Sequence, residues 1–164
     1  MKFVSGTVCC RLPTPLGLMT LAAHDTALVW AGFDGQKHAP DTSAWPLSAT
    51  HTVLRQACEQ LQQYFAFERT DFDIALDLGR GTAFQQSVWR SLRGIASGTT
   101  CSYGTISQHI GRPKAVRAVG GAIGRNPISI IVPCHRVVGS NGALTGYAGG
   151  IDRKIALLQL ESST

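Results

Sequence analysis

The sequence predicts a two-domain α/β protein, with an antiparallel sheet and one helix in residues 1–79 and a helical domain in residues 80–164. Three observations lead to this prediction. Short apolar runs separated by turn-forming residues occupy the beginning of the chain, as in an antiparallel meander. Further along, apolar residues recur at helical spacing. A Gly-Arg-Gly segment at residues 79–81 interrupts the pattern, and the charge balance changes at the same place.

Three strands are expected first, in Gly6–Leu12, Leu16–Ala23 and Thr26–Phe33. A polar, turn-rich loop over residues 36–46 follows them. Apolar side chains then recur every three or four positions over residues 53–65, which predicts a helix that packs on the sheet.

The end of the first domain has a different periodicity. Ile74, Leu76 and Leu78 alternate with Ala75 and Asp77, which predicts a further short strand. The Gly-Arg-Gly segment comes directly after this alternation. We therefore expect the domain boundary there.

The second domain opens with a helix that begins at Thr82 or Ala83. Thr82 and Gln85 have the spacing of a capping box. An apolar stripe at helical spacing follows and consists of Phe84, Val88, Trp89, Leu92 and Ile95.

Two further helices with a tight turn between them are expected next. One runs from Ser102 or Tyr103 to Ile110, and the other covers Lys114–Ile123, after a turn that contains Pro113. The face expected to be buried consists of Ile106, Ile110, Val116, Val119 and Ile123. The side chains expected to stay exposed are Arg112, Lys114 and Arg117. This pattern is typical of a helix-turn-helix with a DNA-reading second helix.

The net charge of +5 is unevenly distributed along the chain. Residues 1–79 carry five basic and eight acidic side chains, whereas residues 80–164 carry ten basic and two acidic ones. The stretch between Asp77 and Asp152 contains seven arginines, one lysine and no acidic residue. Because the forked donors of arginine suit phosphate, a polyanion partner is expected. The alternative is a basic face on an enzyme with a small acidic substrate.

Composition narrows the class of protein. With 44% hydrophobic and 15% charged residues, a chain of 164 residues is expected to fold. No apolar run approaches the ~20 residues of a bilayer span, and no secretory or lipidation signal is visible, so a cytoplasmic protein without a membrane partner is expected. Five cysteines without a CxxC pair predict free thiols and no metal, the alternative being zinc bound by Cys9 or Cys10 with His24 and His51.

The strongest chemical signal is the segment Ile130-Ile131-Val132-Pro133-Cys134-His135-Arg136-Val137-Val138. Pro133 fixes its own φ and favours an extended Val132, so Cys134 is expected at the rigid end of an apolar segment. A nucleophilic cysteine needs a base or a positive field that lowers the pKa of its thiol. His135 and Arg136 can supply that field, whereas the alternative is a buried structural cysteine.

This segment resembles the O6-alkylguanine-DNA alkyltransferases (methylated-DNA–protein-cysteine methyltransferases). Flanking segments carry the resemblance as well: Arg125-Asn126-Pro127, Gly146-Tyr147-Ala148-Gly149-Gly150, Lys114–Gly121 and Ser102-Tyr103-Gly104. The resemblance covers residues 82–161 closely and the first half in outline. It implies a first domain of ribonuclease-H-like outline and a second, helical domain with a winged-helix-like helix-turn-helix.

The resemblance also implies the catalytic residues. Cys134 is expected to accept the alkyl group, His135 to act as its base through a bound water, and Glu161 to orient the imidazole. Asn126 is expected to brace the active-site turn. Tyr103 is expected to contact the DNA backbone near the flipped nucleotide and to donate a proton as the guanine oxygen leaves.

Further residues are expected to contact DNA and the substrate. Arg117 is expected to take the place of the extruded base. The other expected DNA contacts are Lys114, Arg112 and Arg136. The residues expected to form the substrate pocket are Tyr147, Ala148 and Val137. Because many relatives have serine where Ala148 stands, the base oxygen is expected to be bound by backbone N–H here.

The function implied by the resemblance is the direct reversal of O6-alkylguanine, and secondarily of O4-alkylthymine, in double-stranded DNA. The alkyl group passes irreversibly to Cys134, so each molecule acts once, without a cofactor and as a monomer. Two alternatives belong to other classes. One is an alkyltransferase-like protein that binds damaged DNA without repairing it, and the other is a DNA-binding domain with a redox-sensing thiol.

Overall fold

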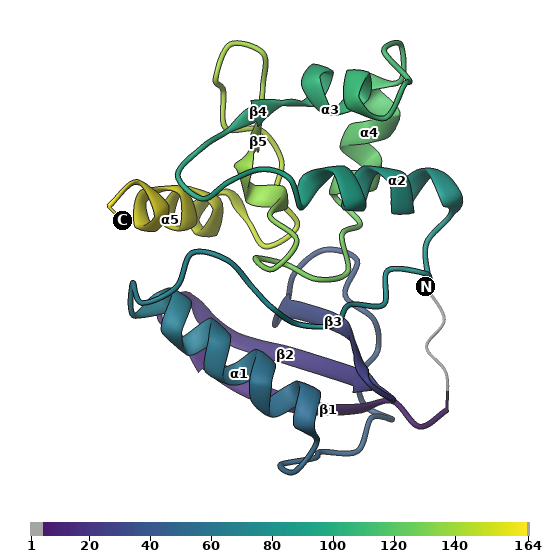
Figure 1. The fold of residues 1–164 in the computed structure, drawn as a ribbon, viewed down its shortest axis with the longest axis vertical. Helices are drawn as coiled ribbons and strands as arrows, with labels where there is room; N and C mark the ends of the chain where they lie inside the picture. Colours follow the sequence, from purple (N-terminus) through teal and green to yellow (C-terminus); the bar gives the residue numbers. More distant parts are fainter. Residues whose placement is uncertain (1–4, 164) are drawn as a thin grey trace.

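The computed structural model describes residues 5–163, with a sheet in the first half of the chain and most of the helices in the second (Figure 1). Three antiparallel strands form the sheet in chain order: β1 (Val8–Thr14), β2 (Gly17–His24) and β3 (Ala27–Phe33). Their connections are tight, because Gly17 (φ +113°) and Asp25 (φ +51°) adopt left-handed backbone conformations that reverse the chain.

Helix α1 (Thr52–Phe65) lies across one face of this sheet (Figure 1). Its buried side chains include Leu54, Ala57, Leu61 and Tyr64. This is the amphipathic face that the spacing of apolar residues predicts.

The free edge of β3 is covered by a later part of the chain. Leu28 N–H donates to Ala75 O (2.8 Å), and Asp77 N–H donates to Leu28 O (2.9 Å). The strand expected over residues 74–78 is therefore reduced to one parallel bridge, in which Leu76 pairs with Leu28 and its two neighbours make the hydrogen bonds.

The second half begins with α2 (Ala83–Leu92), whose expected capping box is present. Thr82 Oγ1 accepts from Gln85 N–H (3.2 Å), and Gln85 Oε1 accepts from Thr82 N–H (3.0 Å). Later elements are the two-stranded parallel pair of β4 (Cys101–Ser102) and β5 (Val137–Val138), the 3-10 turn η1 (Cys134–Arg136) and the terminal helix α5 (Ile151–Ser162).

Two short helices with a turn between them follow β4: α3 (Tyr103–His109) and α4 (Val116–Ile123). Ser102 caps α3 by accepting from Thr105 N–H (3.0 Å). The expectation that Val116 is buried is wrong, since the residue is 40% exposed. Val116 is the first residue of α4, and burial along this helix begins only at Val119.

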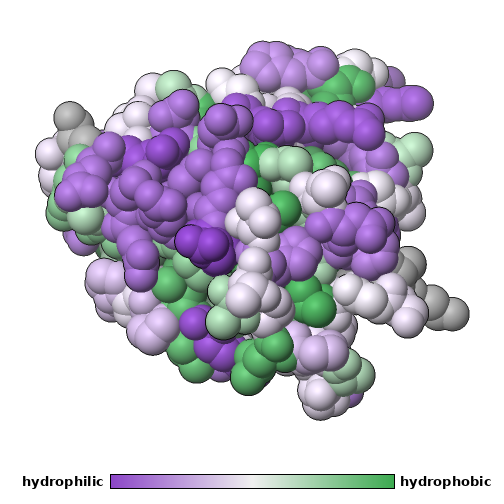
Figure 2. All heavy atoms as spheres, turned by 60° about the horizontal axis from the view of Figure 1, so that its bottom comes forward, coloured by the Kyte–Doolittle hydropathy of each residue, from purple (hydrophilic) through white to green (hydrophobic). Residues whose placement is uncertain are grey.

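One hydrophobic core joins the two halves. Its members include Leu21 and Leu61 from the first half and Trp89, Ile128 and Cys134 from the second. The surface face in Figure 2 shows hydrophobic residues in separate patches among hydrophilic ones. No helix within residues 5–163 is long and apolar enough to cross a membrane.

Candidate active site

The segment that leads to Cys134 is anchored on the sheet of the first half. Ala31 N–H donates to Pro127 O (2.9 Å), and Ser129 N–H donates to Ala31 O (2.7 Å). The chain then turns sharply at Ile130, whose φ of +71° is unfavourable for a β-branched residue and costs about 1–3 kcal/mol. Strand β3 and the local turn together therefore fix the approach to the thiol.

Asn126 braces this turn through both ends of its amide. Its Oδ1 accepts from Ile128 N–H (3.0 Å), while its Nδ2 donates to Val132 O (2.8 Å). The same Nδ2 lies 3.1 Å from the Sγ of Cys134 and donates to it. The side chain expected to brace the turn thus also supplies a hydrogen bond that favours the thiolate.

The thiol of Cys134 is buried, with 4% of the residue exposed. Burial raises the pKa of this thiol, while the hydrogen bond from Asn126 and the positive charge of Lys154 act in the opposite direction. The resting side chain is therefore a thiol, and it needs a base before it can act as a nucleophile.

The ring of His135 is held by a carboxylate. Its Nε2 lies 2.7 Å from Glu161 Oε1, in full burial. Burial lowers the pKa of His135, although Glu161 raises it, so the imidazole is neutral at pH 7. Its Nδ1 is buried and has no hydrogen-bond partner among residues 5–163.

The charge of Glu161 decides which ring nitrogen carries the proton. Burial acts to raise the pKa of this carboxyl, but hydrogen bonds from His135 and Arg136 outweigh it and hold the pKa well below its usual range. An ionised carboxylate only accepts, so Nε2 of His135 must be the protonated nitrogen. Nδ1 is then the acceptor that can take a proton from a thiol.

Arg136 belongs to this buried cluster, which corrects the expectation that it contacts DNA. Its Nε and Nη2 donate to the two oxygens of Glu161 at 2.9 and 2.8 Å, and its Nη1 donates to Ile95 O. Only 6% of the residue is exposed. A buried carboxylate requires a balancing cation, and Arg136 supplies it from inside the fold.

Tyr64 is a member of the cluster that the sequence did not indicate. It lies on α1 in the first half of the chain, and its hydroxyl donates to Glu161 Oε1 (2.7 Å). In the sequence it is one more apolar residue on the buried face of a helix. Its partner stands 97 positions away, so no local pattern could have revealed the contact.

Lys154 is the second residue that sequence reasoning missed. Its buried Nζ donates to the carbonyls of Val137 (2.6 Å) and Thr145 (2.8 Å), and burial lowers the pKa of this amine. It thereby ties the loop after β5 to α5. A signal was available, because Lys154, Leu157 and Glu161 share one helical face on which only Leu157 is apolar.

One cavity of about 170 Å³ brings together three of the residues expected around the substrate. Its lining includes Tyr103, Tyr147 and Ala148, and also Gly146. Tyr103, at the start of α3, donates its hydroxyl to Thr145 O (3.1 Å), which is in the same loop as Gly146. Val137, in contrast, is fully buried in β5 and is not among the residues that line this cavity.

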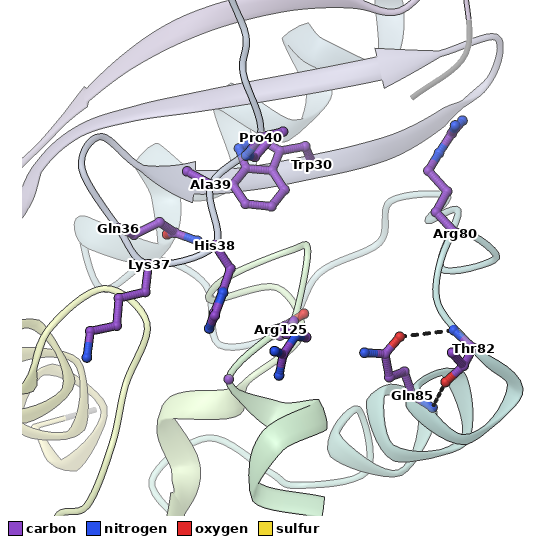
Figure 3. Close-up of a pocket in the computed structure, with 12 residues that line it drawn as sticks. Trp30, Gln36, Lys37, His38, Ala39, Pro40, Arg80, Thr82, Gln85 and Arg125 are labelled. Atoms are coloured by element: carbon purple, nitrogen blue, oxygen red, sulfur yellow. Dashed lines mark hydrogen bonds between the residues drawn. The ribbon is translucent and has the colours of Figure 1, made fainter. Parts of the chain in front are cut away.

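A larger cavity of about 440 Å³ lies beside it, and the two share Lys37, His38 and Gly124 as lining residues. Figure 3 shows Trp30, Pro40 and His38 on one side of this cavity and Arg125, Thr82 and Gln85 on the other. Lys37 and His38 come from the stretch that the sequence describes only as a loop. The structure places that loop at the junction of the two halves.

The three cations that the sequence predicts to be exposed are on the surface of the structure. Arg112, Lys114 and Arg117 are exposed, the first two in the turn before α4 and the third on α4 itself. The turn is held by Arg112 N–H, which donates to Ser107 O (2.9 Å), and by Ser107 Oγ, which donates to Arg112 O. These three charges lie in the stretch of chain that lacks acidic residues.

Comparison with protein families assigns both halves of the chain. The ribonuclease-like domain of 6-O-methylguanine DNA methyltransferase matches residues 8–78, and its DNA-binding domain matches residues 83–163. The chain belongs to this methyltransferase family. The family membership and the fold class expected from the sequence are thereby confirmed.

Individual relatives agree with the family assignment. The methylated-DNA–protein-cysteine methyltransferase of Mycolicibacterium paratuberculosis is 51% identical over 90% of this chain and 88% of its own length. That of Methanosarcina acetivorans is 48% identical over 92% and 95%. The crystal structure of Mycobacterium tuberculosis O6-methylguanine methyltransferase has 49% identity and a TM-score of 0.88, over 96% of this chain and 93% of its own.

A second crystal structure, that of the Mycobacterium tuberculosis protein in complex with DNA, has 50% identity to this chain and a TM-score of 0.87. It covers 93% of this chain and 91% of its own.

The alternative zinc site is not assembled in this structure, because residues 5–163 bring no three His, Cys, Asp or Glu side chains together in a way that could hold a metal ion.

Proposed function

We propose that this protein repairs O6-alkylguanine, and secondarily O4-alkylthymine, in double-stranded DNA by transferring the alkyl group to Cys134. The observation that carries the proposal is the geometry at the thiol. Asn126 Nδ2 donates to Cys134 Sγ at 3.1 Å, and the next residue, His135, is a neutral imidazole held by an ionised Glu161 at 2.7 Å. A thiol with a neutral base and an orienting carboxylate is a nucleophilic constellation.

The chemistry needs only the chain, the damaged base and water. His135 Nδ1 takes the thiol proton through one bridging water, and the thiolate attacks the alkyl carbon. The C–O bond breaks, its electron pair stays on the guanine oxygen, and Tyr103 donates a proton to the leaving base. The Tyr103 phenolate then regains a proton from water while protonated His135 gives its proton up to water. In net terms, the alkyl group and the thiol proton exchange places. The thioether offers no easy return to a thiolate, so each molecule acts once.

The exposed cations of the turn and α4 have a separate role in this proposal. They bind DNA through a helix-turn-helix formed by α3 and α4, with Arg112 and Lys114 at phosphates. A base inside a duplex hides its O6 substituent, so the nucleotide is extruded, and the planar guanidinium of Arg117 fills the gap.

The extruded base enters between Tyr103 and the loop that contains Tyr147 and Ala148. Ala148 has no hydroxyl to donate, and its carbonyl can only accept, as it does from Lys37 N–H (2.9 Å). A backbone N–H of this loop is therefore the donor for the base oxygen. Lys154 holds the same loop at Thr145, two residues before Tyr147.

Peptide mass spectrometry after incubation with an O6-methylguanine duplex tests the proposal. One methyl group per molecule is expected on the peptide that contains Cys134, and Cys134→Ser should bind DNA without any transfer, because an alcohol is far harder to ionise than a thiol. Binding without a mass gain would indicate an alkyltransferase-like binding protein. Repeated turnover, or a methyl group on Cys58 or Cys101, would refute the assignment.

Two accompanying expectations remain predictions. A cytoplasmic location is tested by cell fractionation. A monomer is tested by the molecular mass in solution, with and without DNA.

A further inference from the structure

Two thiols meet between a strand and a helix in the first half of the chain. Cys10 lies on β1 and Cys58 on α1, separated by 48 positions in the sequence. Their Sγ atoms are 3.4 Å apart and share a hydrogen bond. Cys9 is a core residue that is only 2% exposed, whereas Cys10 and Cys58 are both partly buried.

The pair faces an open depression with a volume of about 660 Å³. Both cysteines line it, together with Thr52, Arg55 and Gln62. Small solutes therefore reach this pair, and the lining carries one charge of each sign, from Arg55 and Glu59. Low-pKa, solvent-accessible thiols beside a second cysteine are the ones that oxidants convert to disulfides.

The shared hydrogen bond makes the two thiols unequal. It lowers the pKa of Cys58, because the S–H of Cys10 donates to the Cys58 thiolate. It raises the pKa of Cys10, and burial adds to that effect. Cys58 is therefore the attacking sulfur and Cys10 the one that resolves the intermediate.

We propose that Cys10 and Cys58 form a reversible redox site that hydroperoxides oxidise to an intramolecular disulfide. The Cys58 thiolate attacks one peroxide oxygen, the O–O bond breaks, and a sulfenic acid forms while the other oxygen leaves as water or an alcohol after protonation. Cys10 then attacks the sulfenic sulfur, the S–S bond forms, and a second water leaves. The two sulfurs lose two electrons, which reduce the peroxide; an external dithiol reverses the bond.

The geometry needs little change to close this bond. The Sγ atoms must approach from 3.4 Å to about 2.0 Å. Helix α1 already packs against β1, so the two sulfurs start from neighbouring elements. The disulfide would then link a strand and a helix of the first half, with Cys134 left as a free thiol.

The other cysteines are poorly placed to compete. Cys9 points to the opposite face of β1, where its Sγ donates to Trp45 O (3.4 Å). Burial raises the pKa of Cys101 and of Cys134, so both are less reactive towards peroxide. The oxidation should therefore be selective for one pair among the five cysteines.

Graded oxidation of the full chain with hydrogen peroxide tests the proposal, with remaining thiols blocked by an alkylating reagent before peptide mapping. The expected product has lost two hydrogens, contains a peptide of Cys10 cross-linked to Cys58, and reverts with dithiothreitol. It should form at peroxide concentrations that leave the Cys134 peptide unmodified, and its Tm should be higher than that of the reduced protein.

Three variants identify the sulfurs. Cys10→Ser should accumulate a sulfenic acid on Cys58, detected by its dimedone adduct, and Cys58→Ser should react little at Cys10. Cys101→Ser is the matched control, a partly buried cysteine without a thiol neighbour, and should cross-link like the wild type. Oxidation of Cys134 before the pair, or a peroxide-treated wild type without the Cys10–Cys58 peptide, would overturn the proposal, whether or not the protein repairs DNA.

Discussion

Five of the ten basic side chains of the second half form two groups in opposite environments. Arg136 and Lys154 are buried, and each of their charges is matched by fixed acceptors, Glu161 for the first and loop carbonyls for the second. Arg112, Lys114 and Arg117 are exposed. The same residue types thus have different roles. A buried cation needs hydrogen-bond acceptors or a counter-charge within the fold, whereas an exposed cation is available to a partner.

This difference predicts separate consequences for mutation. Loss of a buried partner leaves an uncompensated charge and should affect stability and chemistry together. Loss of an exposed cation should leave stability within about 0.5 kcal/mol of the wild type and affect only the bound state. Three substitutions test this separation.

Glu161→Gln should have the largest effect. It leaves Arg136 buried without its carboxylate, so the free energy of unfolding should fall by about 3–5 kcal/mol. Transfer from duplex DNA and from free O6-benzylguanine should slow to the same extent, because the tautomer of His135 is no longer fixed. Urea unfolding and two transfer rates measure this, and an unchanged stability would show that the buried charges are not coupled.

The pH dependence of stability sharpens the same test. The pKa of Glu161 is depressed in the folded protein, so its contribution is present above its unfolded pKa of about 4.3 and is lost as pH falls towards the folded value. Neutral, buried His135 acts in the same direction below about pH 6.5. Acid should therefore destabilise the wild type more steeply than Glu161→Gln, measured as Tm against pH.

Arg117→Ala should come next, with an effect confined to DNA. Repair of duplex O6-methylguanine should slow by ~10- to 100-fold, a loss of ~1.4–2.7 kcal/mol from the flipped state. Reaction with free O6-benzylguanine, which needs no flipping, should change much less. Arg112→Ala is the matched control: it should weaken duplex binding and its salt dependence without altering the rate in the bound complex. Equal slowing of both substrates by Arg117→Ala would remove the proposed role.

Tyr64→Phe should have the smallest effect of the three. It removes one of the donors to Glu161 while the ring can keep its packing, so stability should fall by about 0.5–1.5 kcal/mol. Because Arg136 still holds the carboxylate, transfer should slow modestly and equally on both substrates, with DNA affinity unchanged. The informative readout is the pH–rate profile, which should shift if Tyr64 acts through Glu161 and His135 and stay in place if its role is only packing.

Local signals predicted the elements whose causes are local. The capping box set the start of α2, the spacing of apolar residues set α1, and Pro133 with its flanking motif located Cys134. Val116 was misjudged because helical spacing does not tell how far along a short helix the packing extends. The alternation over residues 74–78 was real, but only Leu76 pairs with β3.

The sequence by itself determined the family, the excess of cations in the second half and the position of the cysteine proposed as nucleophile, since each depends on residue types at fixed, short spacing. Only the tertiary structure decided which cations are available. Arg136 is as basic in sequence as Arg117, yet it is buried on Glu161, and Tyr64 joins the same carboxylate from α1. Such contacts depend on how distant segments pack, and on the need of a buried charge for nearby partners, which no local pattern records.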